Sequence, residues 1–375
     1  MNDTPPTDSV DVREAPLTDW VDVLEALLAG EDLNSPTTTW VMAEILTGGT
    51  PPANTAAFLV ALRAKGETAH EVAGLVTAML NVSVPLQVPG PVVDTCGTGG
   101  DRAHTVNIST MAAVVAAAAG ARVAKHGNRA ASSQSGSADM LEALGVAIDL
   151  PAAAAAQAGE LLGITFCFAP VFHPAMRHIG PIRRELAIRT VFNILGPLAN
   201  PAHPAAQVLG VPTEAIGELM AGVLAHRGTR ALVVHGDDGL DELSIHTTST
   251  VWDLTTDTLR RAVVDPAALG LPVRAPDSLR GGTAQRNAAL FGTLLDTPED
   301  PSVAGIRDAV TLNAAAALVA YAAAGGELPV TIPDATTDLM TRLAVALPVV
   351  TDALTSGAAH DLLGRWITTS QNLVL

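Results

Sequence analysis

Cysteine is nearly absent from this sequence: only Cys96 and Cys167 occur among 375 residues, far apart and outside any C-x-x-C spacing. Structural zinc sites and disulfide frameworks both need several cysteines at characteristic spacings, so neither is expected. The HExxH motif of zinc proteases is missing too. We therefore expect a fold without zinc or disulfides, suited to a reducing cytoplasm.

Basic residues are scarce: 21 Lys and Arg stand against 38 Asp and Glu, which gives a formal net charge of −17. Nucleic acids and anionic membranes both favour a basic surface, so we expect neither as a partner. The charge is unevenly spread, because basic residues outnumber acidic ones by eight to five between Arg102 and Arg189. An acidic protein with a locally basic middle suits a small anionic substrate.

Long apolar runs and a secretory signal are also missing. The longest apolar stretches, such as residues 314–324, are shorter than the roughly 20 residues that a membrane-spanning helix needs. Residues 1–14 are polar and acidic, whereas a signal peptide is basic and then apolar. These absences predict a cytoplasmic protein without a membrane partner.

With 48% hydrophobic residues, the chain can form a large core or two domains. Residues 1–15 are rich in Pro, Thr and Asp, and we expect a disordered tail there. Residues 16–87 show helical periodicity. Thr18 is expected to cap the first helix, and Thr68 with Glu71 forms a capping box for the fourth. This part predicts a small all-helical domain.

Residues 88–174 and 204–375 alternate short apolar runs with helical stretches, which predicts an α/β domain with a mostly parallel sheet. We expect strands near residues 91–95, 121–125, 164–169, 207–211 and 231–235, and long helices near 303–324 and 337–354. Residues 175–203 interrupt the alternation and are expected to rejoin the helical domain. The predicted fold class is α/β, with a small helical domain hinged to a larger α/β domain.

The segment 94–101, Asp-Thr-Cys-Gly-Thr-Gly-Gly-Asp, joins a short apolar run to a helix that begins near residues 107–110. Glycines let the backbone approach an anion, and the N–H groups of a helix start point at it, so this pattern predicts a phosphate site. It is neither a Walker A loop nor a dinucleotide fingerprint, because Asp101 and Arg102 follow the last glycine. For this segment alone, a tight turn without a ligand is the alternative.

Two further loops are candidates for binding phosphate. The segment 125–129, Lys-His-Gly-Asn-Arg, follows an expected strand, at the sheet edge where ligands bind. Lys125 and Lys65 are the only lysines, and a compact cation at Lys125 suits a phosphate unless the loop is simply solvated. The serine-rich segment 132–139 precedes an apolar helix. It could bind a diphosphate, or Ser137 could merely cap that helix.

Acidic and basic clusters complete the set of motifs. The segment 235–242, His-Gly-Asp-Asp-Gly-Leu-Asp-Glu, follows an expected strand, and its carboxylates predict either a Mg²⁺ site or a solvated acidic turn. Arg183 or Arg184 could hold a substrate carboxylate, or pair with acidic neighbours on a surface helix. His173 and His178 are isolated, and isolated histidines are more often structural than catalytic.

Taken together and in this order, the motifs resemble those of the anthranilate phosphoribosyltransferase family over residues 17–365. The matching elements are GTGGD, N-x-S-T, KHGNR, SGSAD-x-LEALG, HP-x-M, RRE to LGPL-x-NP, GDDGLDE and the NAAA of the late helix. The chain departs from the family in its extra N-terminal tail and its richness in Ala and Arg. The resemblance implies a homodimer that uses Mg²⁺ and transfers a phosphoribosyl group from phosphoribosyl pyrophosphate to anthranilate, in tryptophan biosynthesis.

The resemblance also implies roles for individual residues. The expected catalytic residues are Lys125, Asn128 and Arg183, and the expected metal ligands are Ser109, Asp241 and Glu242. The substrates would be bound by Gly97, Gly100, Asp101, Thr105, Asn107, Ile108, Ser109, Thr110, Lys125, His126, Gly127, Asn128, Arg129, Ala130, Ala131, Ser132, Ser133, Ser137 and Arg183. Within this set Arg183 would bind the anthranilate carboxylate, with Gly97 and Asn128 beside it.

Two other functions share parts of this pattern. A pyrimidine nucleoside phosphorylase has the same two-domain architecture but uses free phosphate and needs no acidic metal cluster, so GDDGLDE and KHGNR favour the transferase. A nucleic-acid-binding relative on the same fold would need a basic surface, which the net charge of −17 opposes. A pure scaffold would leave the coincidence of phosphate, metal and arginine motifs unexplained.

Overall fold

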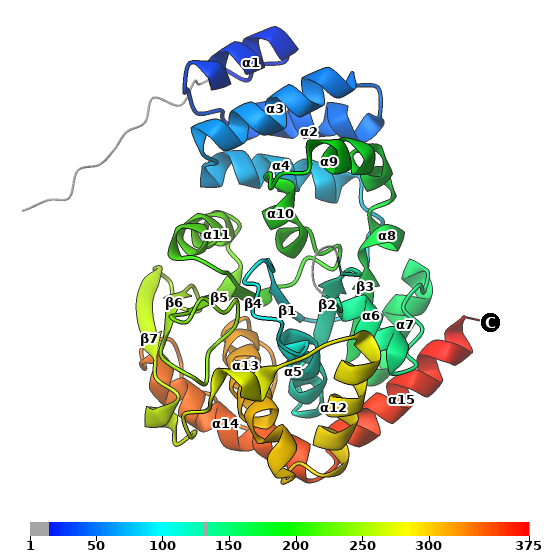
Figure 1. Ribbon diagram of the computed structural model, residues 1–375, viewed down its shortest axis with the longest axis vertical. Helices are drawn as coiled ribbons and strands as arrows, with labels where there is room; N and C mark the ends of the chain where they lie inside the picture. Colours follow the sequence, from blue (N-terminus) through cyan, green and yellow to red (C-terminus); the bar gives the residue numbers. More distant parts are fainter. Residues whose placement is uncertain (1–14, 131–133, 375) are drawn as a thin grey trace, which may run out of the picture. The chain divides into compact units, whose positions relative to one another are not determined.

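The computed structural model describes residues 15–130 and 134–374 (Figure 1). The chain divides into two compact units, one from Met1–Val82 with Ala175–Leu195 and the other from Ser83–Pro174 with Gly196–Leu375. The first unit is all-helical in its described part, and the second contains the sheet. The predicted fold class, a helical domain with a mostly parallel α/β domain, is confirmed.

The helical unit is built from four successive helices and a later segment. The four are α1 (Trp20–Leu28), α2 (Ser35–Thr47), α3 (Pro52–Lys65) and α4 (Ala69–Asn81), and the later segment contains η1 (Pro174–His178), α9 (Gly180–Leu186) and α10 (Phe192–Leu195). The capping box of Thr68 and Glu71 is confirmed. The predicted first cap was wrong, because Asp19 rather than Thr18 accepts from the first N–H groups of α1. A carboxylate there also suits the positive end of the helix dipole.

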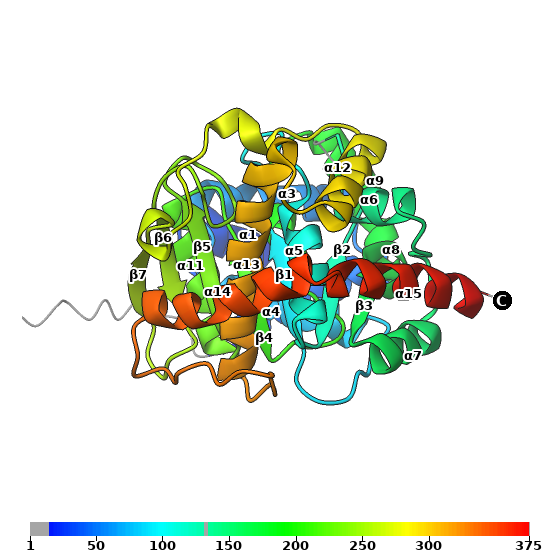
Figure 2. The same ribbon diagram turned by 90° about the horizontal axis from the view of Figure 1, so that it is seen from below.

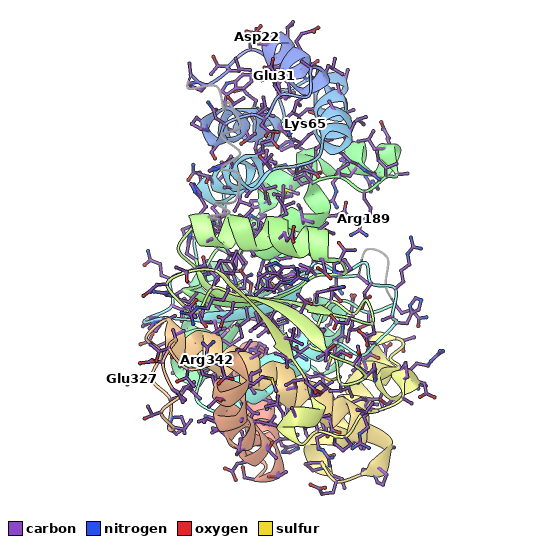
Figure 3. All side chains as sticks on the ribbon, turned by 90° about the vertical axis from the view of Figure 1, so that its left-hand side faces the viewer. Asp22, Glu31, Lys65, Arg189, Glu327 and Arg342 are labelled. Atoms are coloured by element: carbon purple, nitrogen blue, oxygen red, sulfur yellow. The ribbon has the colours of Figure 1, made fainter. Side chains whose placement is uncertain are left out.

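A buried ion cluster ties the helical unit together. Glu71 is fully buried, and its carboxylate accepts from the Leu33 N–H at 2.9 Å and pairs with Lys65 Nζ at 3.0 Å. Lys65, labelled in Figure 3, also pairs with Asp32. One of the two lysines of the chain therefore has a structural role, joining the end of α3 to the start of α4.

The α/β unit is built on a seven-stranded sheet with the order β3-β2-β1-β4-β5-β6-β7. The strands are β1 (Val93–Gly97), β2 (Val123–Gly127), β3 (Ile164–Phe168), β4 (Ala206–Gly210), β5 (Arg230–Gly236), β6 (Ser249–Asp253) and β7 (Arg260–Val264). The first five strands are parallel to one another, β6 is antiparallel to β5, and β7 is antiparallel to β6. The five predicted strands are confirmed, whereas β6 and β7 were not predicted.

Helices cover both faces of this sheet. On one face α5 (Ile108–Ala118) packs against β1 and β2, and α13 (Ala304–Ala323) against β1, β4 and β5. Outside them lie α14 (Leu339–Thr355) and α15 (Ala358–Leu373) (Figure 2). On the other face α11 (Glu214–His226) contacts β5 and β6 (Figure 1). The remaining α-helices of the unit are α6 (Ser137–Ala143), α7 (Ala152–Leu162), α8 (Ala169–Phe172) and α12 (Ala284–Asp296).

The helix α13 is the centre of the hydrophobic core. The helical stretch Pro301–Ala323 has 23 residues, and its most apolar 18-residue window has a mean hydropathy of 1.4, so the expectation that no apolar segment reaches membrane-spanning length was wrong. Of its most apolar window, however, 89% is buried inside the protein. Its small alanine side chains let α5 and α13 pack closely. The helix is therefore long and apolar because it forms the centre of the core. The predicted helices near 303–324 and 337–354 are confirmed as α13 and α14.

Candidate active site

The phosphate-loop motif lies where the strand order of the sheet reverses, between β1 and β4. Gly97 ends β1 and pairs in register with Gly210, the last residue of β4. The backbone then turns through left-handed conformations at Gly99 and Gly100, with φ of 68° and 91°, before α5 begins at Ile108. The predicted order of strand, glycine turn and helix is confirmed, at the position where α/β sheets bind ligands.

Glycines at the ends of these two strands make room for Asp241. A Cβ at Gly97 would lie 2.3 Å from Asp241 Oδ2, and a Cβ at Gly210 would lie 1.6 Å from its backbone oxygen. The Gly99 N–H donates to the same Oδ2 at 2.7 Å. The glycines of the motif therefore accommodate a carboxylate of the chain itself, which the sequence alone did not indicate.

Asp241 and Glu242 form an acidic pair beside the start of α5, where the Ser109 N–H donates to Glu242 Oε1 at 3.2 Å. Loss of hydration raises the pKa of Glu242 to about 8, against the opposing pull of Lys125. Loss of hydration also raises the pKa of Asp241 well above its usual range, and the neighbouring charges of Glu242 and Asp101 raise it further. A cation bound here would restore the charge balance of the cluster.

These carboxylates fit a magnesium ion that is shared with a bound phosphate. Within residues 15–130 and 134–374, no group of three His, Cys, Asp or Glu side chains is arranged to hold a metal alone. Mg²⁺ commonly takes one or two carboxylates and completes its octahedron with water and substrate phosphate oxygens. The pair Asp241 and Glu242, with the Ser109 hydroxyl nearby, offers the protein part of such a set.

The other two acids of the GDDGLDE segment have structural roles. Asp237 accepts from two threonine hydroxyls, and Asp238 accepts from the Ser244 hydroxyl at 2.8 Å, so both close the turn after β5. Asn313 of α13 then bonds the N–H and the C=O of Leu243, at 3.0 and 3.1 Å. Sequence reasoning noted Asn313 only as part of a resemblance. The signal in the sequence that could have revealed its role was a single amide side chain within an alanine-rich helix.

Lys125 lies beneath the phosphate loop, and only 2% of the residue is exposed. Its Nζ donates to the backbone oxygen of Thr95 and to Ser109 Oγ, the latter at 3.4 Å. Burial lowers the pKa of Lys125, and the negative charges of Asp94 and Glu242 oppose that effect. The sequence predicted a cation at this edge of the sheet. In the described contacts the Lys125 ammonium group bonds to oxygen atoms of the protein, those of Thr95 and Ser109, and it is buried rather than open to solvent.

His126 is held in one orientation by a buried polar network. Asp94 accepts from the His126 N–H at 3.2 Å and from Asn200 Nδ2 at 2.9 Å, and His126 Nδ1 lies 3.0 Å from the backbone oxygen of Gly196. Burial lowers the pKa of His126 to about 3, and the nearby His173 adds to the shift. The ring is therefore neutral, with its proton on Nδ1 facing the carbonyl.

The KHGNR loop is tied to α6 by its own side chains. Arg129 pairs with Glu142 at 2.7 Å and with Asp139 at 3.2 Å, and Asp139 also accepts from the Gly136 N–H at 2.8 Å. Gly136 is the N-cap residue of α6, so the alternative in which Ser137 caps this helix was wrong. The reason is that the Asp139 carboxylate reaches back to the start of the helix and satisfies its backbone. The expected binding residues Ala131, Ser132 and Ser133 lie outside the described residues.

Arg183 belongs to α9 of the helical unit. Its guanidinium lies 5.4 Å from the centre of the Phe192 ring, and burial lowers its pKa. Among the described residues no carboxylate pairs with it, so the alternative of an Arg–Glu pair on a surface helix does not apply to Arg183. A half-buried guanidinium supported by an aromatic ring is suited to a bidentate bond with a carboxylate ligand.

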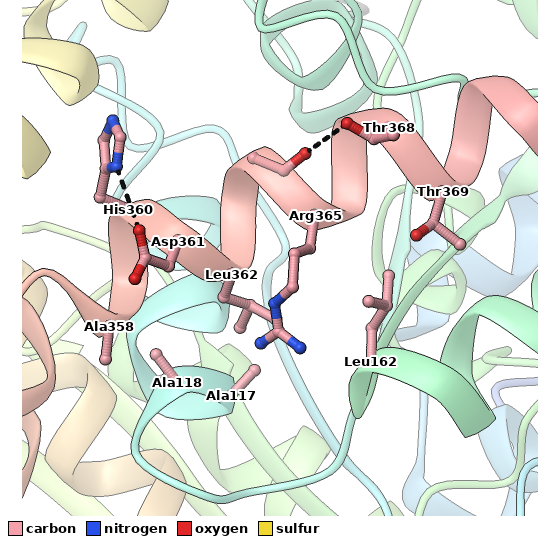
Figure 4. A pocket seen from close by; sticks show the side chains of 11 residues that line it. Ala117, Ala118, Leu162, Ala358, His360, Asp361, Leu362, Arg365, Thr368 and Thr369 are labelled. Atoms are coloured by element: carbon pink, nitrogen blue, oxygen red, sulfur yellow. Dashed lines mark hydrogen bonds and ion pairs between the residues drawn. The ribbon is translucent and has the colours of Figure 1, made fainter.

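A pocket of about 780 Å³ lies elsewhere in the α/β unit, at the C-terminal ends of α5 and α7 and along α15 (Figure 4). Its polar side chains include His360, Asp361 and Arg365. None of the predicted site residues lines it. Because α5 and α7 end where the following parallel strands begin, this pocket lies at the opposite edge of the sheet from the phosphate loop, and the loop remains the candidate active site.

The chain matches two models of known families along most of its length. Residues 21–83 match the helical bundle domain of the glycosyl transferase family, and residues 89–360 match its a/b domain.

Curated relatives are similar in sequence over nearly the whole chain. The anthranilate phosphoribosyltransferase of Thermobifida fusca is 50% identical over 93% of this chain and 96% of the relative. That of a Nocardioides species is 50% identical over 92% and 96%.

Solved structures of similar fold superpose on nearly the whole chain as well. Anthranilate phosphoribosyltransferase from Thermus thermophilus superposes with a TM-score of 0.83 at 41% identity, covering 93% of this chain and 99% of that one. The Saccharomyces cerevisiae enzyme in complex with PRPP and Mg has a TM-score of 0.82 at 26% identity, covering 94% and 98%.

Proposed function

The chain belongs to the anthranilate phosphoribosyltransferases of the glycosyl transferase family, and we infer that it transfers the 5-phosphoribosyl group of phosphoribosyl pyrophosphate to the amine of anthranilate. The products are N-(5-phosphoribosyl)anthranilate and pyrophosphate, and the reaction belongs to tryptophan biosynthesis. The observation that carries this inference is the 50% identity over 93% of the chain. It favours the transferase over both a nucleoside phosphorylase and a nucleic-acid-binding relative.

We propose that phosphoribosyl pyrophosphate binds at the phosphate loop of the α/β unit. The motif-matched ligands are Gly97, Gly100, Asp101, Thr105, Asn107, Ile108, Ser109, Thr110, Lys125, Gly127, Arg129, Ala130, Ala131, Ser132, Ser133 and Ser137. The left-handed glycine turn at the carboxyl edge of the sheet and the buried cation Lys125 beside it support this proposal, since ligands of α/β sheets bind at this edge. The S. cerevisiae enzyme has been solved with PRPP and Mg.

We also propose that Mg²⁺ is held by Asp241 and Glu242 with the Ser109 hydroxyl. When bound, the ion neutralises charge on the pyrophosphate group that leaves. Its removal with EDTA should abolish activity. In the double variant Asp241→Asn with Glu242→Gln, activity should fall steeply and require more Mg²⁺, whereas an unchanged Mg²⁺ titration would exclude these ligands.

For anthranilate, we propose that Arg183 binds the carboxylate, with Gly97, His126 and Asn128 close to the bound ring. Arg183→Ala should then raise the KM for anthranilate far more than the KM for phosphoribosyl pyrophosphate. The neighbouring exposed Arg184→Ala serves as the matched control, with little effect on either KM. Equal effects of Arg183→Ala on both constants would contradict the carboxylate role.

The reaction needs positioning more than acid–base chemistry. The nitrogen of an aromatic amine is largely neutral and nucleophilic at neutral pH; it attacks C1 of the ribose as the bond to pyrophosphate breaks. The electron pair leaves with pyrophosphate, and the nitrogen then loses a proton. The residues of this chain would contribute by orienting the two substrates, with Lys125 placing positive charge beneath the loop and Asn128 beside the acceptor.

The first experiment mixes purified protein with Mg²⁺, phosphoribosyl pyrophosphate and anthranilate and follows the loss of anthranilate fluorescence. Loss that requires all three components and stops with EDTA is the expected result. If anthranilate persists although phosphoribosyl pyrophosphate binding is demonstrated, the acceptor assignment is wrong and other amines must be tested.

We further propose that the chain works in the cytoplasm as a homodimer. Two free, buried cysteines suit a reducing compartment. Exposed apolar side chains on α1 and α3, Val21 at 67%, Leu28 at 74% and Val60 at 43%, support self-association through the helical unit. Light scattering after size exclusion should give twice the chain mass of 38.3 kDa, and the monomer mass would exclude the dimer.

A further inference from the structure

Asn107 occupies the N-cap position of α5 but does not cap the helix with its side chain. Asn is among the residues that prefer this position, because its side-chain oxygen normally accepts from the N–H groups of the first turn. Here the Ser109 N–H is bonded to Glu242 instead. The polar atoms of the Asn107 side chain are therefore directed elsewhere, and their partners identify what they do.

A relay of hydrogen bonds holds the Asn107 amide. Asn287 Nδ2 donates to Asn107 Oδ1 at 2.8 Å, and Asn107 Nδ2 donates to the backbone oxygen of Ser135 at 3.0 Å. Asn287 Oδ1 in turn accepts from the Gly282 N–H at 2.8 Å. The relay thus runs from a backbone N–H, through two amide side chains, to a backbone C=O.

The backbone groups at the two ends fix the direction of this relay. An N–H can only donate and a C=O can only accept, so neither amide can be flipped without placing like groups against each other. The Asn107 Oδ1 faces Asn287 and also accepts, over a longer distance of 3.2 Å, from the Ser135 hydroxyl, while the Asn107 nitrogen faces the Ser135 backbone oxygen. An amide nitrogen carries two N–H groups, and within the described residues only one of those of Asn107 has a partner. The second is left to donate to a ligand at the start of α5.

Asn287 is well placed to impose this geometry. It lies in the first turn of α12, and only 1% of it is exposed, so water cannot replace its bonds. The segment before α12 is locked to the phosphate loop by backbone bonds from Val106 N–H to Leu279 O and from Gly281 N–H to His104 O, both at 2.9 Å.

Gly281 has no room for a side chain in this arrangement, because a Cβ there would lie 2.5 Å from the Thr105 oxygen. The start of α12 therefore follows the phosphate loop closely.

We propose that Asn287 is a positioning residue for phosphoribosyl pyrophosphate: it fixes the polarity of the Asn107 amide so that an N–H points at the substrate. The proposal rests on the proposed function, in which Asn107 binds that substrate. Asn287 itself touches no substrate, and no sequence motif matched it to a role. It affects substrate binding only by orienting the Asn107 amide.

The sharpest test is Asn287→Asp, which keeps the shape and the acceptor for Gly282 but replaces the donor to Asn107 with an acceptor. Neither orientation of the Asn107 amide then satisfies both neighbours. The KM for phosphoribosyl pyrophosphate should rise about tenfold, as for the loss of one well-placed hydrogen bond, while the KM for anthranilate changes less than about twofold. Asn287→Ser provides a second variant if the first fails to fold, as judged by its melting temperature.

A double-mutant cycle with Asn107→Ala separates a positioning role from a general structural one. If Asn287 acts through Asn107, Asn287→Asp should add less than about twofold to the KM of the Asn107→Ala enzyme. An undiminished effect in that background would overturn the proposal. So would Asn287→Asp raising both KM values equally, or leaving both unchanged.

Thr283→Ala is the matched control, since it removes the N-cap bond of the same helix to the Arg286 N–H without touching Asn107. A rise in the KM for phosphoribosyl pyrophosphate as large as that of Asn287→Asp would mean that any disturbance of α12 suffices, and would overturn the proposal. If Asn107→Ala leaves the KM for phosphoribosyl pyrophosphate unchanged, then Asn107 does not bind this substrate and the positioning role of Asn287 is excluded as well.

If Asn107→Ala raises this KM but Asn287→Asp does not, only the positioning role of Asn287 is excluded.

Discussion

At the scale of single residues, the site depends on glycines, which leave room because they carry no side chain, as much as on its charged groups. Gly97 and Gly210 end neighbouring strands, and Asp241 fills the space that their side chains would need. The charged part is equally local, since one buried lysine, Lys125, lies close enough to Glu242 for the two charges to interact. Small changes at these positions should therefore act on the metal and phosphate region without unfolding the unit.

Gly97→Ala tests this close packing. The new Cβ would lie 2.3 Å from Asp241 Oδ2, so the carboxylate must move away from the Gly99 N–H. We expect kcat/KM to fall about 100-fold, the scale of a misplaced reacting group, together with a higher Mg²⁺ requirement. Gly292→Ala in α12 is the control, because no atom lies within 4 Å of its added Cβ. Unchanged kinetics in Gly97→Ala would show that Asp241 tolerates displacement.

His126 predicts a pH dependence of stability. Its pKa is about 3 in the folded chain, against an ordinary value of 6.5, because the neutral ring is buried. The unfolded chain therefore binds the extra proton first. The stabilisation is complete above pH 6.5 and is lost as the pH falls from 6.5 toward 3.

The variant His126→Gln should lose less stability than the wild type across this range. Melting temperatures from pH 7.5 to about 4 measure the difference. The control is His360→Gln, which removes an exposed ring, 57% accessible, that pairs with Asp296 at the surface, and it should change the melting curve less than His126→Gln does. Parallel curves for wild type and His126→Gln would contradict the buried neutral ring.

At the scale of elements, the antiparallel edge of the sheet is held by a helix from the end of the chain. Arg342 of α14, labelled in Figure 3, pairs with Asp253 of β6, and only 2% and 4% of the two side chains are exposed. Its guanidinium also donates to the Thr255 hydroxyl. This buried pair joins α14 to β6, one of the two strands that the sequence did not predict.

Arg342→Met should destabilise the α/β unit by about 3–5 kcal/mol, because it leaves the Asp253 carboxylate buried without its partner. Urea denaturation measures the loss. Asp257→Asn breaks the exposed pair with Arg230, whose side chains are 36% and 96% accessible, and should cost less than about 1 kcal/mol. Similar losses in the two variants would mean that burial does not decide the strength of these pairs.

Element prediction from the sequence succeeded where a local signal existed. The capping box at Thr68 and the apolar runs of the five parallel strands carry such signals, and each element formed within two residues of its predicted place. The strand β7 has none: it begins with Arg260 and Arg261 and is largely exposed. A partly exposed edge strand is stabilised by its neighbour rather than by its own pattern, so its sequence alone could not reveal it.

At the scale of the whole molecule, the net charge of −17 limits the partners of the chain. Labelled duplex DNA should show no rise in fluorescence anisotropy with up to about 10 μM protein at roughly 0.15 M salt. Binding that weakens steeply as salt increases would instead indicate a basic surface on one unit, and would reopen the nucleic-acid-binding alternative.

The sequence by itself determined the fold class, the order of the motifs and the family, because each depends on patterns within a few neighbouring residues. The tertiary structure decided which atoms meet. Asp94 with Asn200, Ser109 with Glu242 and Asn107 with Asn287 are each more than 100 residues apart, and only the folding of the α/β unit brings them into contact. Hydrogen bonds act over about 3 Å, so a role that depends on the partner of a side chain is set by folding and cannot be seen in the order of residues.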